Sequence, residues 1–330
     1  MKIKKLLVLL FAVCISVAHA HDWPDRSIRF ISPYPPGGSN DNATRLIAEK
    51  LSPMLNQRIV VENLPGKDTV HASELISKSK PDGYNFIMLA SPHTANPSFY
   101  EALPYDTNTH FTPIIQVVKV PLFLMVPADS PIKTVPELIA AAERNPNGIN
   151  VSTTGNGGGP HLALMVLTNI TKANLKHSPY NGDKPALADI KSSKVDGGIH
   201  PIVSALPDIK DGKIRVLAVF GSKRSSLLPD VPSLGELGYA NTDVYAWFGL
   251  AGPAKLPAKI VNRMNKDVNE ILLDPAVKQR LAEMGMEPLG GTPTQYKKFI
   301  DNDIRKWKEF LARHPMSYAN NNINGTLGRL

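Results

Sequence analysis

A strand, a glycine turn and a helix follow one another in Ile28-Arg29-Phe30-Ile31-Ser32-Pro33-Tyr34-Pro35-Pro36-Gly37-Gly38-Ser39-Asn40-Asp41. Apolar residues then recur at helical spacing from Ala43 to Leu55, so the two glycines come directly before a helix. The first N–H groups of a helix have no partner within it, and together with the helix dipole they attract anions. The stretch therefore predicts a cradle for a carboxylate or phosphate, with a plain Pro-Gly turn as the alternative.

The same order of strand, loop and helix continues along the chain. Strands that alternate with helices form mainly parallel sheets covered on both faces, and ligands collect beyond the carboxyl ends of such strands. The polar segment 91–97 follows a strand, and we predict it as a loop that faces the same crevice as loop 34–41. Expected strands lie at 28–32, 59–61, 84–90, 122–126, 149–152, 195–199, 215–220 and 244–250, and expected helices at 43–55, 70–76, 135–142, 162–166, 184–191, 260–272, 277–284 and 296–307.

A second glycine-rich loop, Thr153-Thr154-Gly155-Asn156-Gly157-Gly158-Gly159-Pro160-His161, also precedes a predicted helix. Pro160 suits the first turn of that helix, where a missing N–H costs least. Two such anion sites in one chain of 330 residues suggest two lobes, with the segments that cross between them acting as hinges.

The first residues have the pattern of a secretory signal peptide. Three lysines precede the apolar run 6–17, and Ala18-His19-Ala20 matches a signal-peptidase site, which predicts export to the periplasm after cleavage behind Ala20. A lipoprotein cut before Cys14 is the competing interpretation. Cys14 is the only cysteine, so the mature chain is expected to have no thiol catalysis, disulfide or Cys-ligated metal.

The charge of the chain favours small anionic ligands. Removing the three signal lysines from the formal net charge of +8 leaves +5, and these charges are spread out rather than clustered. No aromatic-basic nucleic-acid motif accompanies them, so we expect no nucleic-acid partner.

Motifs for catalysis or metal binding are missing from the sequence, which contains no Gly-x-Ser-x-Gly, His-Glu-x-x-His or phosphate-loop pattern. Its histidines are scattered singly, and we expect no metal site, no cofactor and no catalytic residue. The alternative from another class is a periplasmic hydrolase of small carboxylate esters or amides, if Ser39, Ser91, His93, His161 and Asp41 meet in one cleft; it requires a serine–histidine hydrogen bond.

Short motifs spread over about 300 residues resemble one family, the periplasmic substrate-binding proteins of tripartite tricarboxylate transporters, often called Bug receptors. The matching segments are Trp23-Pro24, Pro33 to Asp41, Val60-Val61-Glu62-Asn63, Pro65-Gly66, Pro81-Asp82-Gly83-Tyr84, Asn96-Pro97, Leu103-Pro104-Tyr105-Asp106, Gly155-Asn156-Gly157, His161-Leu162, Pro179-Tyr180, Ser204-Ala205-Leu206-Pro207, Leu228-Pro229-Asp230-Val231-Pro232 and Trp247-Phe248-Gly249-Leu250.

The resemblance implies a two-lobed type II periplasmic-binding-protein fold, or Venus flytrap, in which each lobe is a mixed, mainly parallel sheet flanked by helices. Lobe one would comprise 22–123 and 247–312, lobe two 124–246, and 313–330 would be a poorly ordered tail. The receptor would act as a monomer, capture a small organic carboxylate between the lobes, and deliver it to the membrane subunits of such a transporter or to a sensor.

The residues that the resemblance carries over to the ligand site lie in the loops of both lobes. They are Tyr34, Gly37, Gly38, Ser39, Asp41, Ser91 and His93 in lobe one, and Thr154, Asn156, Gly157, His161 and His200 in lobe two. We expect backbone N–H groups and Ser39 to hold one carboxylate, and Asp41 to brace its own loop, because a second negative charge beside the ligand is unfavourable.

Three segments depart from the pattern of the family. Lys67-Asp68-Thr69 stands where the family usually has Ala-Gly-Gly, Gly158-Gly159-Pro160 where hydroxyl residues are common, and His200-Pro201 where an acidic residue and Asn are common. His200 is expected to donate a hydrogen bond to a second carboxylate of the ligand, which would favour acids without an amino group. The alternative is a histidine that faces solvent before the next helix.

Overall fold

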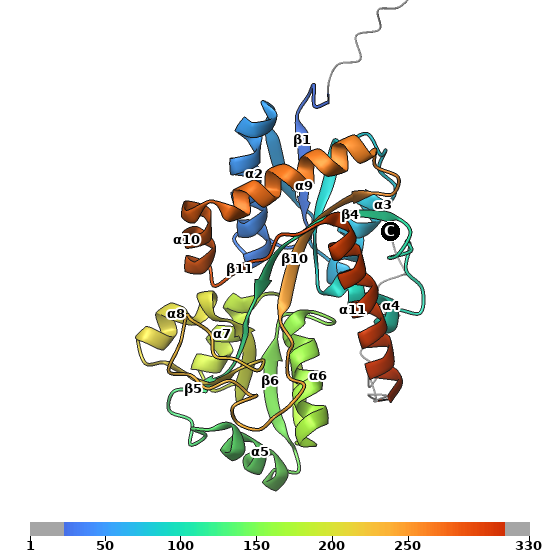
Figure 1. Ribbon diagram of the computed structural model, residues 1–330. Coiled ribbons are helices and arrows are strands. Elements are labelled where there is room, and N and C mark those ends of the chain that lie inside the picture. Colours follow the sequence, from blue (N-terminus) through green and yellow to red (C-terminus); the bar gives the residue numbers. More distant parts are fainter. Residues whose placement is uncertain (1–22, 314–330) are drawn as a thin grey trace, which may run out of the picture.

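Two β-sheets, each flanked by helices, make up the computed structural model, which describes residues 23–313 (Figure 1). The predicted signal peptide, with Cys14, lies outside the described residues, and so does the predicted tail apart from Arg313, which ends the last helix. None of the helices in the described part of the chain is both long and apolar enough to cross a membrane.

The first sheet has six strands in the order β11-β4-β10-β3-β1-β2. Strands β1, β2 and β3 are parallel, whereas β10 is antiparallel to both of its neighbours, β3 and β4. The bounds are β1 Ile28–Ser32, β2 Ile59–Asn63, β3 Asn85–Ala90, β4 Phe111–Val120, β10 Ala246–Pro253 and β11 Glu287–Pro288.

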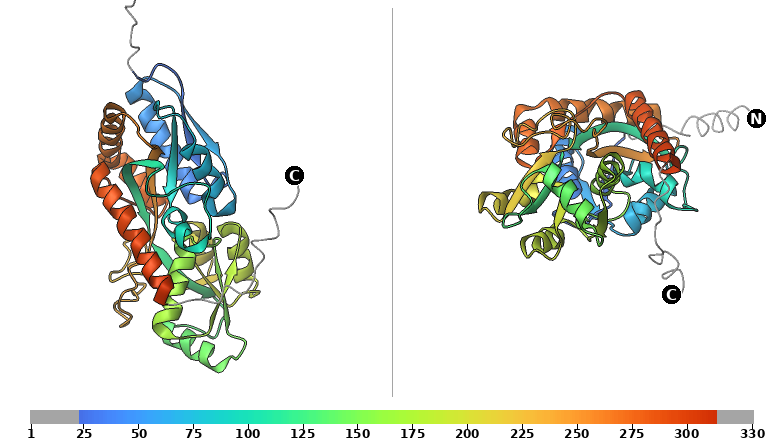
Figure 2. Two further views of the ribbon diagram at one scale, coloured as in Figure 1. Left: turned by 90° about the vertical axis from the view of Figure 1, so that its right-hand side faces the viewer. Right: turned by 90° about the horizontal axis from the view of Figure 1, so that it is seen from below.

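Helices cover both faces of this sheet. Helices α2 and α9 pack together on one face, and α3, α4 and α11 cover the other. Figure 2 shows α11 running along the side of the molecule past the junction of the two sheets. The bounds are α2 Ser39–Leu55, η1 Lys67–Thr69, α3 Val70–Ser77, α4 Pro92–Phe99, α9 Ala258–Leu273, α10 Pro275–Glu283 and α11 Pro293–Arg313.

The second sheet has five strands in the order β7-β6-β8-β5-β9. Strands β7, β6 and β8 are parallel, and β5 is antiparallel to its neighbours β8 and β9. The bounds are β5 Leu122–Pro127, α5 Val135–Arg144, β6 Ile149–Thr153, α6 Gly159–Thr171, β7 Leu175–Pro179, α7 Asp183–Lys191, β8 Gly197–Pro201, α8 Ile202–Lys210 and β9 Ile214–Val219.

The chain passes between the sheets at two places. Only Pro121 separates β4 in the first sheet from β5 in the second, and the return follows β9 through the segment 220–245 into β10. Lobe two is therefore inserted into lobe one, and Figure 1 shows the two lobes one above the other.

Most of the predicted elements are present, but the prediction of a loop at 91–97 is wrong. Helix α4 begins at Pro92, because proline is favourable in a first turn and because Thr94 and Ala95 are buried against the sheet. The antiparallel direction of β10, and of β5 beside β8, makes both sheets mixed.

Candidate functional site

The carboxyl ends of the parallel strands of the two sheets face each other across the junction of the lobes. The backbone N–H of Asn156, in the loop after β6, donates to Oδ1 of Asp68 at 3.3 Å, which joins lobe two to lobe one. Close by, the rings of Phe99 and His161 lie 5.8 Å apart between their centroids. The loop 153–161 that the sequence singled out therefore lies at this junction, against Asp68 and α4 of lobe one.

The turn between β1 and α2 presents unpaired backbone donors. Helix α2 begins at Ser39. The residue before it, Gly38, has an extended backbone (φ −75°, ψ 167°) and no side chain that could cap the helix. Asn42 donates to the carbonyl of Gly38 at 2.9 Å, so the N–H groups of the first turn before it have no helical acceptor. Gly37 has φ +80°, a conformation that suits glycine. This arrangement can receive a carboxylate.

Asp41 holds this turn in place. Its carboxylate accepts the N–H of Gly37 at 2.9 Å, Nε of Arg45 at 3.0 Å and Nδ2 of Asn63 at 2.7 Å. Burial alone would raise the pKa of Asp41, but these hydrogen bonds outweigh burial and lower it. The prediction that Asp41 braces its loop is confirmed.

Tyr34 lies at the start of the same turn, half-buried, and its carbonyl accepts Nδ2 of Asn63 at 2.9 Å. Burial raises the pKa of Tyr34, and the charges of Asp68 and Asp183 raise it further. Because Asp183 belongs to lobe two, this electrostatic effect acts from one lobe to the other.

Ser91 and His93 are both buried in lobe one. The hydroxyl of Ser91 accepts the N–H of Trp247 at 3.3 Å, and both residues are buried. His93 is buried in the core of lobe one, where its ring lies 4.7 Å from that of Phe111 and is stacked at 6.3 Å on Tyr105. Its two nitrogens have no hydrogen-bond partner in the described chain, and burial lowers its pKa to about 3. We therefore place His93 in the core rather than at the ligand.

The loop before α6 rests on two stacked histidines. The N–H of Gly157 donates to Nδ1 of His161 at 3.0 Å, and the ring of His161 stacks on His177 with centroids 3.9 Å apart. Nε2 of His177 lies 2.6 Å from Oγ1 of Thr153. Burial lowers the pKa of both histidines, for His177 to about 4, so both are neutral at pH 7. Gly157 itself faces lobe one, since a Cβ there would lie 3.4 Å from Asn96 Oδ1.

His200 is fully buried, which excludes the solvent-facing alternative. Its Nε2 lies 2.9 Å from Oγ of Ser152, and its Nδ1 lies 3.0 Å from Oδ1 of Asp183. Both ring nitrogens are thus occupied, so the expected hydrogen bond from His200 to a ligand is not available. His200 instead fixes the carboxylate of Asp183 at the start of α7, where Ser204 also donates to it at 3.3 Å.

Ser152, His200 and Asp183 follow the order of a catalytic triad, but the arrangement lacks room for a substrate. Ser152 is fully buried, and its hydroxyl also lies 3.3 Å from the carbonyl of Gly197. A single Cβ added at Gly198 would be 2.5 Å from that hydroxyl, so the backbone of β8 lies directly against it. Ser152, His200 and Asp183 therefore form a structural chain of hydrogen bonds, and the hydrolase alternative gains no support.

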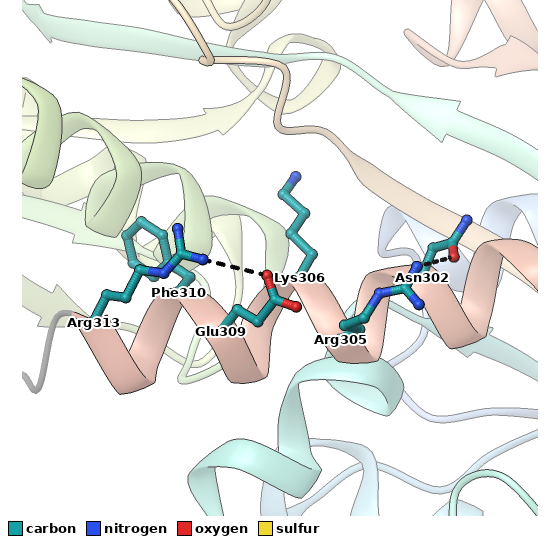
Figure 3. A pocket seen from close by; sticks show the side chains of 6 residues that line it. All are labelled: Asn302, Arg305, Lys306, Glu309, Phe310 and Arg313. Carbon is teal, nitrogen blue, oxygen red and sulfur yellow. Dashed lines mark hydrogen bonds and ion pairs between the residues drawn. The ribbon is translucent and has the colours of Figure 1, made fainter.

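Two surface hollows lie along α11. One, of about 410 Å³, is formed by the end of α11 alone, and Figure 3 shows Arg313 pairing with Glu309 and Arg305 donating to Asn302 there. The other, of about 450 Å³, lies between α11 and the return segment beside Trp247, and Ser91 and Leu162 of α6 also line it. Among residues 23–313, no three His, Cys, Asp or Glu side chains converge to hold a metal ion.

Comparison with known proteins agrees with this geometry. The family model described as the tripartite tricarboxylate transporter family receptor matches residues 43–315. The chain belongs to this family. Protein BugT of Bordetella pertussis is 32% identical to it over 290 residues, which span 87% of this chain and 89% of BugT.

Solved structures of similar receptors confirm the predicted fold class. The Rhodopseudomonas palustris protein Rpa4515, solved with adipate, has a TM-score of 0.83 and 30% identity over 88% of this chain and 98% of its own. MatC of the same organism, solved with bound malate, has a TM-score of 0.80 and 27% identity over 88% of this chain and all of its own.

Sequence reasoning missed the two acidic residues at the junction. In the sequence, Lys67-Asp68-Thr69 stands out only as a departure from the pattern of the family, and Asp183, directly before the expected helix 184–191, is given no role. A signal was present in both cases, because each carboxylate follows a glycine, Asp68 two residues after Gly66 and Asp183 one residue after Gly182, in a turn beyond the end of a strand.

Proposed function

We propose that the protein is a periplasmic receptor that captures a small organic carboxylate between its two lobes and presents it to the membrane subunits of a tripartite tricarboxylate-type transporter. The observation that carries the proposal is the β1–α2 turn, in which the first N–H groups of α2 have no helical acceptor and Tyr34 lies within the field of Asp183 in lobe two. The adipate and malate bound in the two Rhodopseudomonas structures support a carboxylate ligand.

The proposal includes no covalent step. Lobe one corresponds to 22–123 with 247–312 and lobe two to 124–246, the receptor acts as a monomer, and the signal peptide is removed after Ala20. The ligand residues are those of the two loops, with the N–H of Ser39 donating from lobe one and the loop of Asn156 and Gly157 closing from lobe two.

Calorimetry of protein purified without refolding, against a panel of mono-, di- and aminocarboxylates, tests this function, and native mass spectrometry identifies any ligand that co-purifies. We expect one-to-one binding that needs no metal. Product formed from a bound compound, a requirement for metal, or no binding by any member of the panel would contradict the proposal.

Ser39→Pro tests the role of the backbone donors. Proline at the first helical position removes one N–H while keeping a helical φ, and the extended backbone of Gly38 tolerates a following proline. We expect Ser39→Pro to weaken binding by about 1.5–3 kcal/mol, the range for a charged hydrogen bond. Ser39→Ala, which keeps the N–H, is the matched control. Equal affinities for Ser39→Pro and Ser39→Ala would mean that this N–H does not hold the ligand.

A further inference from the structure

Asp68 occupies a turn that is unfavourable for every residue in it. Lys67, Asp68 and Thr69 have φ of +47°, +50° and +74°, so three successive residues with side chains adopt left-handed conformations. Neighbouring groups hold the turn, since Nδ2 of Asn96 donates to the carbonyl of Asp68 at 2.9 Å and the hydroxyl of Tyr100 donates to its Oδ2 at 2.9 Å. Such a conformation persists only where its surroundings impose it.

The other oxygen of this carboxylate, Oδ1, reaches the loop in lobe two that the sequence predicts to bind an anion. Oδ1 of Asp68 accepts the N–H of Asn156, and a Cβ at Gly155 would lie 3.3 Å from the same oxygen. A carboxylate of the protein therefore already sits against the backbone of this loop. A ligand carboxylate would have to displace it and would meet its charge.

Asp183 brings a second carboxylate to the same junction from the other lobe. Nδ1 of His200 and the hydroxyl of Ser204 hold it at 3.0 and 3.3 Å, and its side chain remains 17% exposed. Tyr34, in the lobe-one turn, is within the field of both Asp68 and Asp183. Within residues 23–313, neither carboxylate forms an ion pair with a lysine or arginine.

The two ends of the junction thus differ in charge preference. The start of α2 presents N–H donors, which favour a carboxylate, whereas Asp68 and Asp183 present acceptors, which favour a hydrogen-bond donor or a cation. We propose that Asp68 and Asp183 make this receptor select acids with a single carboxylate and an amino group at the far end, over dicarboxylates of the same length. This inference rests on the proposed function and replaces the expectation based on His200.

Two pairs of probes of matched length separate the two ligand classes by calorimetry at pH 7.5. Adipate is compared with 5-aminopentanoate, and succinate with 3-aminopropanoate. For the wild-type protein we expect the amino acid of at least one pair to bind at least tenfold more tightly than its dicarboxylate.

Two substitutions of Asp68 separate the effect of its charge from the effect of its side chain on the backbone of the lobe-two loop. Asp68→Asn removes the charge but keeps an oxygen that can accept the N–H of Asn156, whereas Asp68→Gly removes both and suits the left-handed conformation, so it is expected to fold. We expect the preference for the amino acid to shrink severalfold in Asp68→Asn and in Asp183→Asn, and dicarboxylate affinity to rise at least tenfold in Asp68→Gly. Asp211→Asn removes an exposed surface charge and is the control, with unchanged preference.

The outcomes distinguish this inference from the proposed function. If dicarboxylates bind the wild type as tightly as the amino acids do, or if Asp68→Gly leaves the preference unchanged, the inference is wrong and the receptor function stands. If none of the four probes and no other carboxylate of the panel binds, both are wrong.

Discussion

Two neutral histidines stacked under a glycine loop show how strongly burial changes the meaning of a residue. His161 and His177 are nearly parallel, with 6° between their ring planes, and a pair of imidazolium rings at 3.9 Å would repel. Their hydrogen bonds to Gly157 and Thr153 are compatible with neutral rings. The loop that closes on lobe one is therefore supported by a pair that must stay unprotonated.

The depressed pKa of His177 predicts acid lability. The unfolded chain takes up a proton near the ordinary pKa of about 6.5, whereas folded His177 resists until about 4, so its contribution to stability is complete above pH 6.5 and is lost as the pH falls toward 4. As the pH falls through this range, we expect the free energy of unfolding to decrease by about 1–3 kcal/mol less in His177→Gln than in the wild type. Guanidinium titrations at pH 7.5, 6 and 5 measure the difference. The exposed His71→Gln is the control, and an identical pH dependence in all three proteins would refute the assignment.

The residues that sequence reasoning placed correctly are those whose role is local. Asp41 lies four residues from Gly37, so a carboxylate that caps its own turn follows from the pattern. The partners of His200 come from β6 and α7, and His93 depends on Phe111 in a strand that we did not predict. Such long-range partners are set by the packing of elements, which a single sequence does not contain.

Strand β10 and helix α11 meet at a glycine that leaves no room for a side chain. A Cβ at Gly249 would lie 2.2 Å from the hydroxyl oxygen of Tyr296 and 2.3 Å from its Cζ. Tyr296 is buried and packs edge-on against Trp247. The aromatic face of α11 therefore sits directly on the backbone of the sheet.

Gly249→Ala is expected to destabilise the protein by about 1–3 kcal/mol, the usual cost of overpacking, because both the strand and the buried ring resist movement. Tyr296→Leu in the same chain should recover part of this loss, so that the double variant is more stable than additivity predicts. Thermal and denaturant unfolding measure both effects. Gly38→Ala, where a Cβ makes only an ordinary 3.5 Å contact, is the control. Strict additivity of the two changes would show that they do not interact.

Helices and strands whose apolar residues recur at regular spacing were predictable from the sequence, whereas elements that contain prolines and polar residues were not. Helix α4 contains two prolines and polar residues, so its sequence resembles a loop, and only its burial against α11 and the sheet shows why it is a helix. Strand β4 begins Phe-Thr-Pro, and Pro113 hides its strand pattern. Tertiary packing decides both cases.

The inter-lobe hydrogen bond of Asp68 has a consequence for the shape of the unliganded receptor. Because the carboxylate of Asp68 in lobe one accepts the N–H of Asn156 in lobe two without any ligand atom taking part in the bond, it favours a closed arrangement of the lobes. We expect unliganded Asp68→Gly to have a larger radius of gyration than the wild type in small-angle scattering, and a saturating carboxylate to reduce that difference. Equal radii for the two unliganded proteins would show that the bond does not hold the lobes together.

The two-lobed architecture was predictable because alternation of strands and helices, two glycine loops and a family resemblance all point to it. The direction of β10 was not, since neither its composition nor its length distinguishes a parallel strand from an antiparallel one. The charge balance of the junction was not predictable either, because it depends on which acids the fold brings together.

Strand β10 arrives last among the long strands of its sheet, yet it lies between β3 and β4. Because the ribosome makes the N-terminus first, strands β5 to β9 are all available before β10 and can complete the second sheet. At that stage β3 and β4 of the first sheet still expose unpaired edges. More than a hundred residues separate the end of β4 at Val120 from the start of β10 at Ala246. During synthesis, β3 and β4 therefore keep unpaired edges until the last quarter of the sequence has been made, and these edges can pair with other chains.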